Sequence, residues 1–306
     1  MVKKRSFAKT FWAQRYLMIL VLPAVVWMLI FCYYPLYGLT IAFKDYNIGL
    51  GIFGSPWCGL KNFVELYHDA TFIKSIRNSL LFSLLDLVFC MPFPVFFALL
   101  INELRGCNLF KRVTQTMSYL PHFLSWAFAA SFLLSFTGDK GALNTILQAL
   151  GILKAPKAFM SSVPSFIVLM VVASIWKTFG YSSIIYLAAM TSVDQEIYEA
   201  ADIDGAGRLD RVWYITLPSI KSVIVIMLIL TMGSLLNTGF EQFYLLQNSF
   251  VADYAKVMDV YTYEVGMQKA RFSYSTAVGM FKSVVSMVLI LISNWISNKL
   301  TGDGIL

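Results

Sequence analysis

Long apolar stretches, broken by short polar ones, dominate the pattern of this chain. Six stretches of about 20 residues are almost entirely apolar, at 16–37, 79–101, 113–136, 164–189, 222–240 and 274–296. A helix needs roughly 20 apolar residues to cross a bilayer, and it satisfies its own backbone hydrogen bonds there. We therefore predict an all-α membrane protein with six transmembrane helices.

Composition supports a membrane protein. Of 306 residues, 58% are hydrophobic and 13% are charged, whereas soluble domains carry about 25% charged residues. The net charge of +7 does not indicate nucleic acid, because the basic residues are scattered singly. The four cysteines have neither disulfide-framework nor zinc-site spacing, and no metal site is expected.

Basic residues in the polar flanks predict the orientation. Five lie in the N-terminal tail, three in 102–112 and three in 190–221, and Lys299 follows the last span. Because cytoplasmic loops are enriched in Lys and Arg, we expect a cytoplasmic tail at 1–15, a transmembrane domain at 16–298 and a cytoplasmic tail at 299–306. The segment 190–221 is also expected in the cytoplasm.

Three charged residues interrupt the predicted spans, namely Asp86, Lys177 and Lys282. A charge at mid-bilayer costs about 3 kcal/mol or more, so each should face protein or water. Asp86 and Lys177 allow two readings, a polar translocation path and structural pairing between helices. For Lys282 the structural reading is favoured. Lys177 and Tyr181 share a helix face, because they are four residues apart.

The segment 196–221 is unusually polar for this chain. Ile197, Ala200, Ala201 and Asp204 recur at helical spacing. Gly205 then permits a sharp bend, and an apolar stripe beyond it predicts a second short helix. This pattern is typical of an amphipathic helix pair at a membrane surface, and it equally fits a docking element for a soluble partner.

A resemblance decides between these readings. The stretch "EAADIDGAGRLDRVWYITLP" resembles the EAA loop of permease subunits of binding-protein-dependent ABC importers. The matching residues are Glu199, Ala200, Ala201, Asp204, Gly205, Ala206, Leu217 and Pro218. Other stretches, such as "FCYYPLYGLTIAFKDY" and "YLPHFLSW", resemble carbohydrate-importer permeases, in particular those for polysaccharides and complex oligosaccharides. The resemblance extends over nearly the whole chain.

The resemblance implies a location and partners. The EAA loop, between helices four and five, would be a coupling helix seated in a groove of a cytoplasmic ATPase. The chain would lie in the lipid of a bacterial plasma (inner) membrane. It would assemble with a second homologous permease, two ATPase subunits and an extracytoplasmic sugar-binding protein. ATP and Mg would be bound by the ATPase subunits, because GxxxxGK[ST] does not occur here.

We therefore expect the membrane-spanning permease subunit of an ATP-driven importer for an oligosaccharide or related glycan. No catalytic residue or cofactor of its own is expected, and His68 and His122 are interpreted as structural. Candidate substrate-path residues are Asp86, Trp126, Trp176, Lys177 and Tyr181, the aromatic ones as faces for sugar rings. The alternatives are a secondary transporter driven by an ion gradient and a membrane scaffold or receptor subunit without transport.

Overall fold

The computed structural model describes residues 14–104 and 108–301, with side chains up to Lys299. Over these residues the chain forms helices joined by turns and loops, and β-type pairing is limited to an isolated antiparallel bridge between Lys44 and Trp57. The prediction of an all-helical chain is thereby confirmed for the described part. The predicted tails, 1–15 and 299–306, fall mostly outside the described residues and their location stays a prediction.

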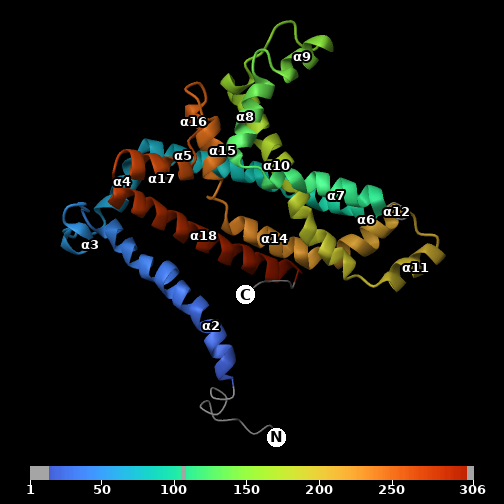
Figure 1. The fold of residues 1–306 in the computed structure, drawn as a ribbon, viewed down its shortest axis with the longest axis horizontal. Coiled ribbons are helices and arrows are strands. Elements are labelled where there is room, and N and C mark those ends of the chain that lie inside the picture. Colours follow the sequence, from blue (N-terminus) through green and yellow to red (C-terminus); the bar gives the residue numbers. More distant parts are fainter. Residues whose placement is uncertain (1–13, 105–107, 302–306) are drawn as a thin grey trace. The chain divides into compact units, whose positions relative to one another are not determined.

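The helices follow one another closely along the chain (Figure 1). In order they are α2 (Arg15–Met28), η1 (Leu29–Tyr33), η2 (Tyr34–Phe43), α3 (Gly51–Gly54), α4 (Lys61–His68), α5 (Ala70–Leu85), η3 (Asp86–Cys90), α6 (Pro92–Asn102), α7 (Asn108–Phe123), α8 (Trp126–Thr137), α9 (Ala142–Ala149), η4 (Phe159–Ser161), α10 (Val163–Thr191), α11 (Gln195–Ile203), α12 (Arg208–Arg211), η5 (Val212–Thr216), α13 (Leu217–Ser219), α14 (Lys221–Gly233), α15 (Phe240–Leu246), α16 (Ala252–Ala255), α17 (Met258–Tyr263), η6 (Glu264–Gln268) and α18 (Phe272–Thr301).

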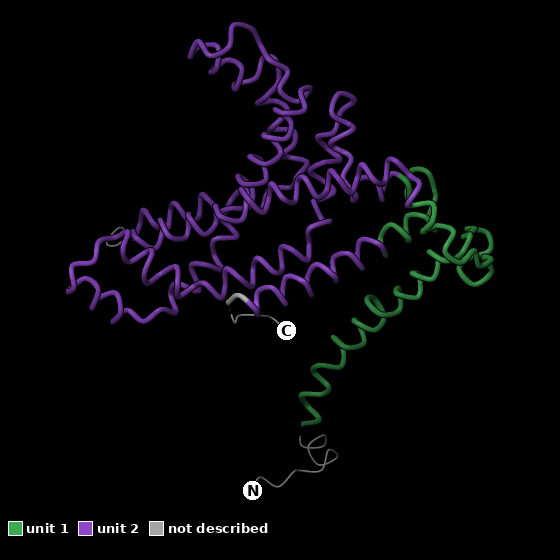
Figure 2. The backbone as a smooth tube through the Cα atoms, turned by 180° about the vertical axis from the view of Figure 1, so that it is seen from behind, with its two compact units in different colours: residues 1–66, 265–280 green, residues 67–264, 281–306 purple. Residues whose placement is uncertain are grey.

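The chain divides into two compact units, coloured separately in Figure 2. Unit 1 comprises residues 1–66 and 265–280, and unit 2 comprises residues 67–264 and 281–306. In unit 1, the ion pair of Arg271 with Glu65 (2.6 Å) and the hydrogen bond from the Tyr46 amide to Ser273 Oγ (3.0 Å) join its two chain segments. These polar contacts hold together segments about 200 residues apart in sequence.

The first helical stretch of unit 1 is exposed over almost its whole surface. It runs from Arg15 to Phe43, 29 residues, and nothing in its most apolar window is buried. A helix that is apolar all round needs lipid or another helix around it. The sequence prediction of a first span at 16–37 agrees with this helix.

Four helical stretches are long and apolar enough to cross a membrane. They are Arg15–Phe43, Ala70–Asn102, Val163–Thr191 and Phe272–Lys299. Two further candidates are bent pairs: Asn108–Phe123 with Trp126–Ala149, at 100°, and Arg208–Ser219 with Lys221–Gly233, at 60°. By length and composition, the described residues therefore contain four candidate spans, or up to six if each bent pair counts as one.

The third and fifth predicted spans differ from the structure because their helices break. The run 113–136 was expected to be one helix, but it bends between α7 and α8, beside Pro121 within the last turn of α7. The run 222–240 was expected to be helical to its end, but α14 stops at Gly233. With 13 residues, α14 is about 20 Å long, shorter than the roughly 30 Å hydrocarbon core.

The second helix begins earlier than the apolar pattern suggested. Asp69 caps α5, and its carboxylate accepts from the amides of Thr71 (2.7 Å) and Phe72 (3.2 Å). Three polar residues in the first half of α5 are buried, namely Ser75, Asn78 and Ser79. Asn78 Nδ2 donates to the carbonyls of Asp253 (2.7 Å) and Lys256 (3.0 Å). These contacts attach the α16 region to α5, and explain why helix extends beyond the apolar run.

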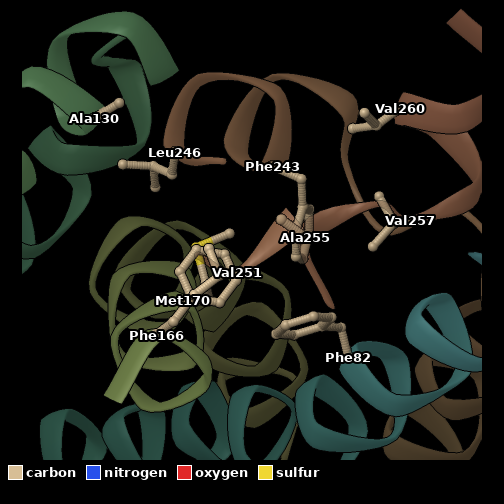
Figure 3. Packing of buried hydrophobic residues seen from close by; sticks show 10 residues of the cluster. All are labelled: Phe82, Ala130, Phe166, Met170, Phe243, Leu246, Val251, Ala255, Val257 and Val260. Atoms are coloured by element: carbon tan, nitrogen blue, oxygen red, sulfur yellow. The ribbon is translucent and has the colours of Figure 1, made fainter. Parts of the chain in front are cut away.

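Unit 2 has a continuous apolar core. Ten buried side chains from α5, α8, α10 and the α15–α17 region pack together (Figure 3): Phe82, Ala130, Phe166, Met170, Phe243, Leu246, Val251, Ala255, Val257 and Val260. A second cluster, around Ala98, Tyr186 and Ile220, joins α6, α10 and the start of α14. Because α10 contributes to both clusters, it is the helix around which this unit packs.

Candidate functional site

The polar segment that follows the fourth predicted span folds as a helix, a glycine bend and a second helix. Residues 195–219, hereafter the helix–bend–helix segment, comprise α11, α12, η5 and α13. Asp194 caps α11, and its carboxylate accepts from the Glu196 amide (3.0 Å). The local structure matches the expectation from the sequence. Its place on the cytoplasmic side stays a prediction.

Gly205 makes the bend possible through its backbone conformation. Its φ is +80°, in the left-handed region that favours glycine. The Ala206 amide donates to the Ala201 carbonyl (2.9 Å), which closes the end of α11. A Cβ added at Gly205 would meet nothing within 4 Å. Glycine is therefore favoured at this position by its dihedral angle, and not by a close neighbour that would exclude a side chain.

The predicted coupling residues form a surface. Glu199, Ala200, Asp204 and Gly205 are exposed, whereas Ala201 and Ala206 are half-buried. Ile203, between them, is 87% exposed. The exposed side chain of Ile203 offers a partner apolar area for the core of an interface, and the acidic side chains around it offer charge for the rim.

The buried face of this segment holds residues that sequence reasoning did not select. The Tyr198 hydroxyl and the Thr216 hydroxyl lie 2.9 Å apart and share a hydrogen bond that joins α11 to η5. Arg211 forms ion pairs with Asp202 of α11 and with Glu103 at the end of α6 (3.3 Å to Glu103). In Figure 1, α12 lies beside the end of α6, in agreement with this contact.

A second group of polar residues lines cavities of unit 2, and Ser234 and Asn237 in it are exposed. A cavity of about 60 Å³ is lined by Ser83, Asp86, Thr231, Ser234 and Asn237, together with two leucines. A larger cavity of about 490 Å³ also reaches Asn237 and includes Lys282, Ser283 and Ser286. Polar groups facing such cavities are spared the cost of facing lipid. The polar interior group, as we call these residues, contains one predicted path residue, Asp86.

The sequence held a signal for this interior group. In "TMGSLLNTG", Gly233, Ser234, Asn237 and Gly239 interrupt the fifth apolar run. Gly239 has a φ of +90°, and the segment between α14 and α15 is not helical. Non-helical backbone at membrane depth is tolerated where it is buried in protein or lines a cavity. Polar residues beside two glycines in an apolar run therefore indicate an interior break.

Lys177 lies at the break in the third span and not beside Asp86. It is 7% exposed, and its ammonium donates to the carbonyls of Pro121 (3.4 Å), His122 (3.0 Å) and Leu124. The last carbonyls of a helix lack partners within that helix, so Lys177 supplies them from α10. The same ammonium lies 5.4 Å from the Trp126 ring centroid, within range of a cation–π interaction.

Three of the predicted path residues gather at this break. Trp126 begins α8 and contacts Lys177, and Tyr181 stacks on His122 with ring centroids 3.9 Å apart. Tyr181 is 43% exposed, so one part of its ring is accessible. Trp176 lies apart from this group. It stacks near Phe132 at 6.2 Å and lines a cavity of about 370 Å³ with Pro121.

Metal binding has no support in the described residues. No group of three or more His, Cys, Asp or Glu side chains is placed there to hold an ion. The chemistry that the site residues offer is hydrogen bonding, aromatic stacking and ion pairing, all suited to binding and to transmitting motion.

These features define a class: a multi-pass helical membrane protein with polar cavities between its helices and an exposed helix–bend–helix segment. The chain belongs to the family of binding-protein-dependent transport system inner membrane components, whose model matches residues 69–302. It is accordingly a permease component of an ABC transport system.

Individual relatives agree with the family. The polygalacturonan/rhamnogalacturonan transport system permease protein YteP of Bacillus subtilis (strain 168) is 44% identical, over 95% of this chain and 90% of its own length. Protein LplB of the same organism is 44% identical, over 95% and 91%. A chain in the crystal structure of a bacterial alginate ABC transporter, in complex with an alginate pentasaccharide-bound periplasmic protein, superimposes with a TM-score of 0.88 at 35% identity, covering 98% of this chain and 99% of that one.

Lys177→Met tests the capping role. Loss of the ammonium removes a donor from the carbonyls of His122 and Leu124, and an unsatisfied polar group shielded from water costs about 1–3 kcal/mol. We expect a lower unfolding temperature for the purified chain in detergent, followed by circular dichroism. The exposed Lys140→Met, which loses the same charge, should unfold as the wild type does. Equal unfolding temperatures for Lys177→Met and wild type would contradict the capping role.

Proposed function

We propose that this chain is the membrane-spanning permease subunit of an ATP-driven importer for an oligosaccharide or related glycan. The observation that carries the proposal is the similarity, over 98% of the chain, to a transporter chain solved with an alginate pentasaccharide-bound periplasmic protein. Relatives named for polygalacturonan/rhamnogalacturonan and for arabinooligosaccharides point to the same substrate class. Family membership favours this function over an ion-driven transporter or a scaffold.

The proposed assembly contains a second homologous permease, two cytoplasmic ATPase subunits and an extracytoplasmic sugar-binding protein. ATP and Mg would be bound by the ATPase subunits. The exposed apolar helix Arg15–Phe43 fits an assembly in which lipid and further helices surround it. The periplasmic protein in the similar structure supports a binding-protein partner here.

We propose six spans, in which the bent pair Asn108–Phe123 and Trp126–Ala149 crosses as the third and Lys221–Gly233 begins the fifth, while Arg208–Ser219 stays at the cytoplasmic surface. Both termini and the helix–bend–helix segment then lie in the cytoplasm, where the basic flanks place them. Glu199, Ala200, Ala201, Asp204, Gly205 and Ala206 would contact the ATPase. The exposure of Glu199, Ala200, Asp204 and Gly205 supports a docking role.

The proposed substrate path runs between helices of this chain and its partner permease. Tyr181 and Trp126 would present aromatic faces to sugar rings, and Asp86 would present a hydrogen-bonding group beside Ser234 and Asn237. Lys177 would contribute by holding the end of α7 and Trp126 in place. Trp176 would line the path from the α10 side.

Gly205→Val and Glu199→Lys test the coupling role. Valine in the left-handed region is strained by roughly 1–2 kcal/mol, and the lysine reverses a charge on the docking surface. We expect both variants to insert, but to lose uptake and the stimulation of ATP hydrolysis by loaded binding protein. Gly207→Ala is the control, since Gly207 has an ordinary φ of −70°. Wild-type stimulation in both variants would count against docking here.

Single cysteines in a cysteine-free background test the topology. Arg208→Cys should resist an impermeant thiol reagent added to intact cells, because the segment is proposed to face the cytoplasm. Lys154→Cys, in the exposed loop after α9, should react. Both should react in opened membranes. Strong labelling at position 208 in intact cells would overturn the proposed orientation.

Tyr181→Ala and Asp86→Asn test the path. Loss of an aromatic face costs a sugar about 1 kcal/mol or more of binding, so we expect at least a several-fold drop in uptake at unchanged membrane abundance. Tyr33→Ala removes an exposed tyrosine from the first helix and should leave uptake unchanged. Transport at the wild-type rate by both path variants would reject these residues as path residues.

A further inference from the structure

The ion pairs of Arg211 join two parts of unit 2 that are far apart in sequence. One guanidinium nitrogen contacts Asp202 in α11, and the other contacts Glu103 Oε2 at 3.3 Å, just beyond the last residue of α6. Arg211 is 8% exposed and the Glu103 side chain 15%. Two carboxylates thus share one nearly buried cation, which ties the helix–bend–helix segment to the end of the second span.

The helix–bend–helix segment is itself held together as one body. The hydrogen bond between Tyr198 and Thr216 joins its first helix to η5, and the Gly207 amide donates to Asp210 in a capping box at the start of α12 (2.9 Å). Arg211 adds its contact to Asp202. A displacement of α11 therefore carries α12 and η5 with it.

The packing beside Arg211 is open. A cavity of about 800 Å³ separates α6 from α12 and η5, and its walls include Val95, Leu99 and Leu104 on one side and Leu209, Val212 and Trp213 on the other. These wall side chains are apolar, so they offer no hydrogen bond or ion pair between the two sides. Glu103 borders the same cavity, so the ion pair bridges α6 and the segment at the edge of the gap.

The chemistry of arginine suits this position. Its guanidinium is planar and carries several donors in a fixed fork, so it can hold two carboxylates at once in a defined geometry. A lysine ammonium on a flexible stem would engage them as a point charge. An ion pair shielded from water is also weakened less by solvent and salt than an exposed one.

We propose that Arg211 is a positioning residue that transmits movement of the helix–bend–helix segment to the second span through Glu103. The inference rests on the proposed function, in which an ATPase moves this segment. It adds which part of the bundle receives the movement, namely α6. The helix η3, which contains Asp86 of the polar interior group, belongs to the same helical stretch, so it would move with α6.

The test uses the complete complex in vesicles, with Glu103→Gln, Arg211→Gln and the double variant. Three quantities are measured: ATPase subunits retained on purification, ATP hydrolysis with loaded binding protein, and uptake per ATP hydrolysed. We expect full retention of the ATPase in all three variants. Uptake per ATP should fall about fivefold or more, the lower range of measured couplings between sites. The double variant should lose no more than Arg211→Gln alone, because both remove one link.

Arg208→Gln is the matched control. It removes the same charge from an exposed position three residues away and should keep uptake per ATP at the wild-type ratio. Arg211→Lys should fall between Arg211→Gln and wild type. A merely structural role would lower abundance and hydrolysis together and leave uptake per ATP unchanged.

Several results would overturn the proposal. These are an unchanged ratio in Glu103→Gln and Arg211→Gln, losses that add in the double variant, and release of the ATPase from the Arg211 variants. The last would move Arg211 to the docking surface. Absence of ATP-dependent uptake by the wild-type complex would contradict the proposed function itself. This outcome is read from the wild type alone, so it is distinct from any result with the variants.

Discussion

The rest of this structure depends on how backbone hydrogen bonds are satisfied where helices break inside an apolar chain. A continuous helix supplies its own partners, but each break leaves carbonyl and amide groups that lipid cannot satisfy. In the third span Lys177 donates to the carbonyls at the end of α7. After α14, Ser83 donates to the Leu235 carbonyl and turn hydrogen bonds hold residues 234–237. Each break is thus paired with side chains from a neighbouring long helix.

This constraint explains why polar residues sit where they do. Lys177, Ser83 and Gln242, which donates to the Met170 carbonyl at 2.9 Å, all serve a backbone group of another element. The breaks in turn let other polar groups, such as Asn237, face cavities. On the proposed function, the same breaks that need these donors would provide hydrogen-bonding groups for a substrate path. Loss of the donor and loss of the path residue should have different signatures, in stability and in uptake.

The sequence predicted elements that depend on local pattern, and it failed where distant contacts decide. The unbroken helices Val163–Thr191 and Phe272–Thr301 were recognisable from apolar length, and the bend at Gly205 from the glycine. The polar start of α5 was not, because Asn78 is stabilised by carbonyls about 175 residues away. For Lys177 the sequence left a path role and structural pairing open, and its role in the path stays a prediction. Its carbonyl partners, on the preceding span, leave no local pattern.

The helix–bend–helix segment shows the same division between local and distant information. Its exposed residues form a contiguous motif, which suits the proposed docking, because one short stretch can provide the whole surface. Its buried residues form contacts that the motif does not reveal. Tyr198 and Thr216 share a hydrogen bond within the segment, and Arg211 donates to Glu103, 108 positions earlier in the chain. A surface that only bound a partner would have no need of such a link. A segment that must move the membrane helices has to be rigid within itself and attached at a defined place, and the buried face of this segment meets both conditions.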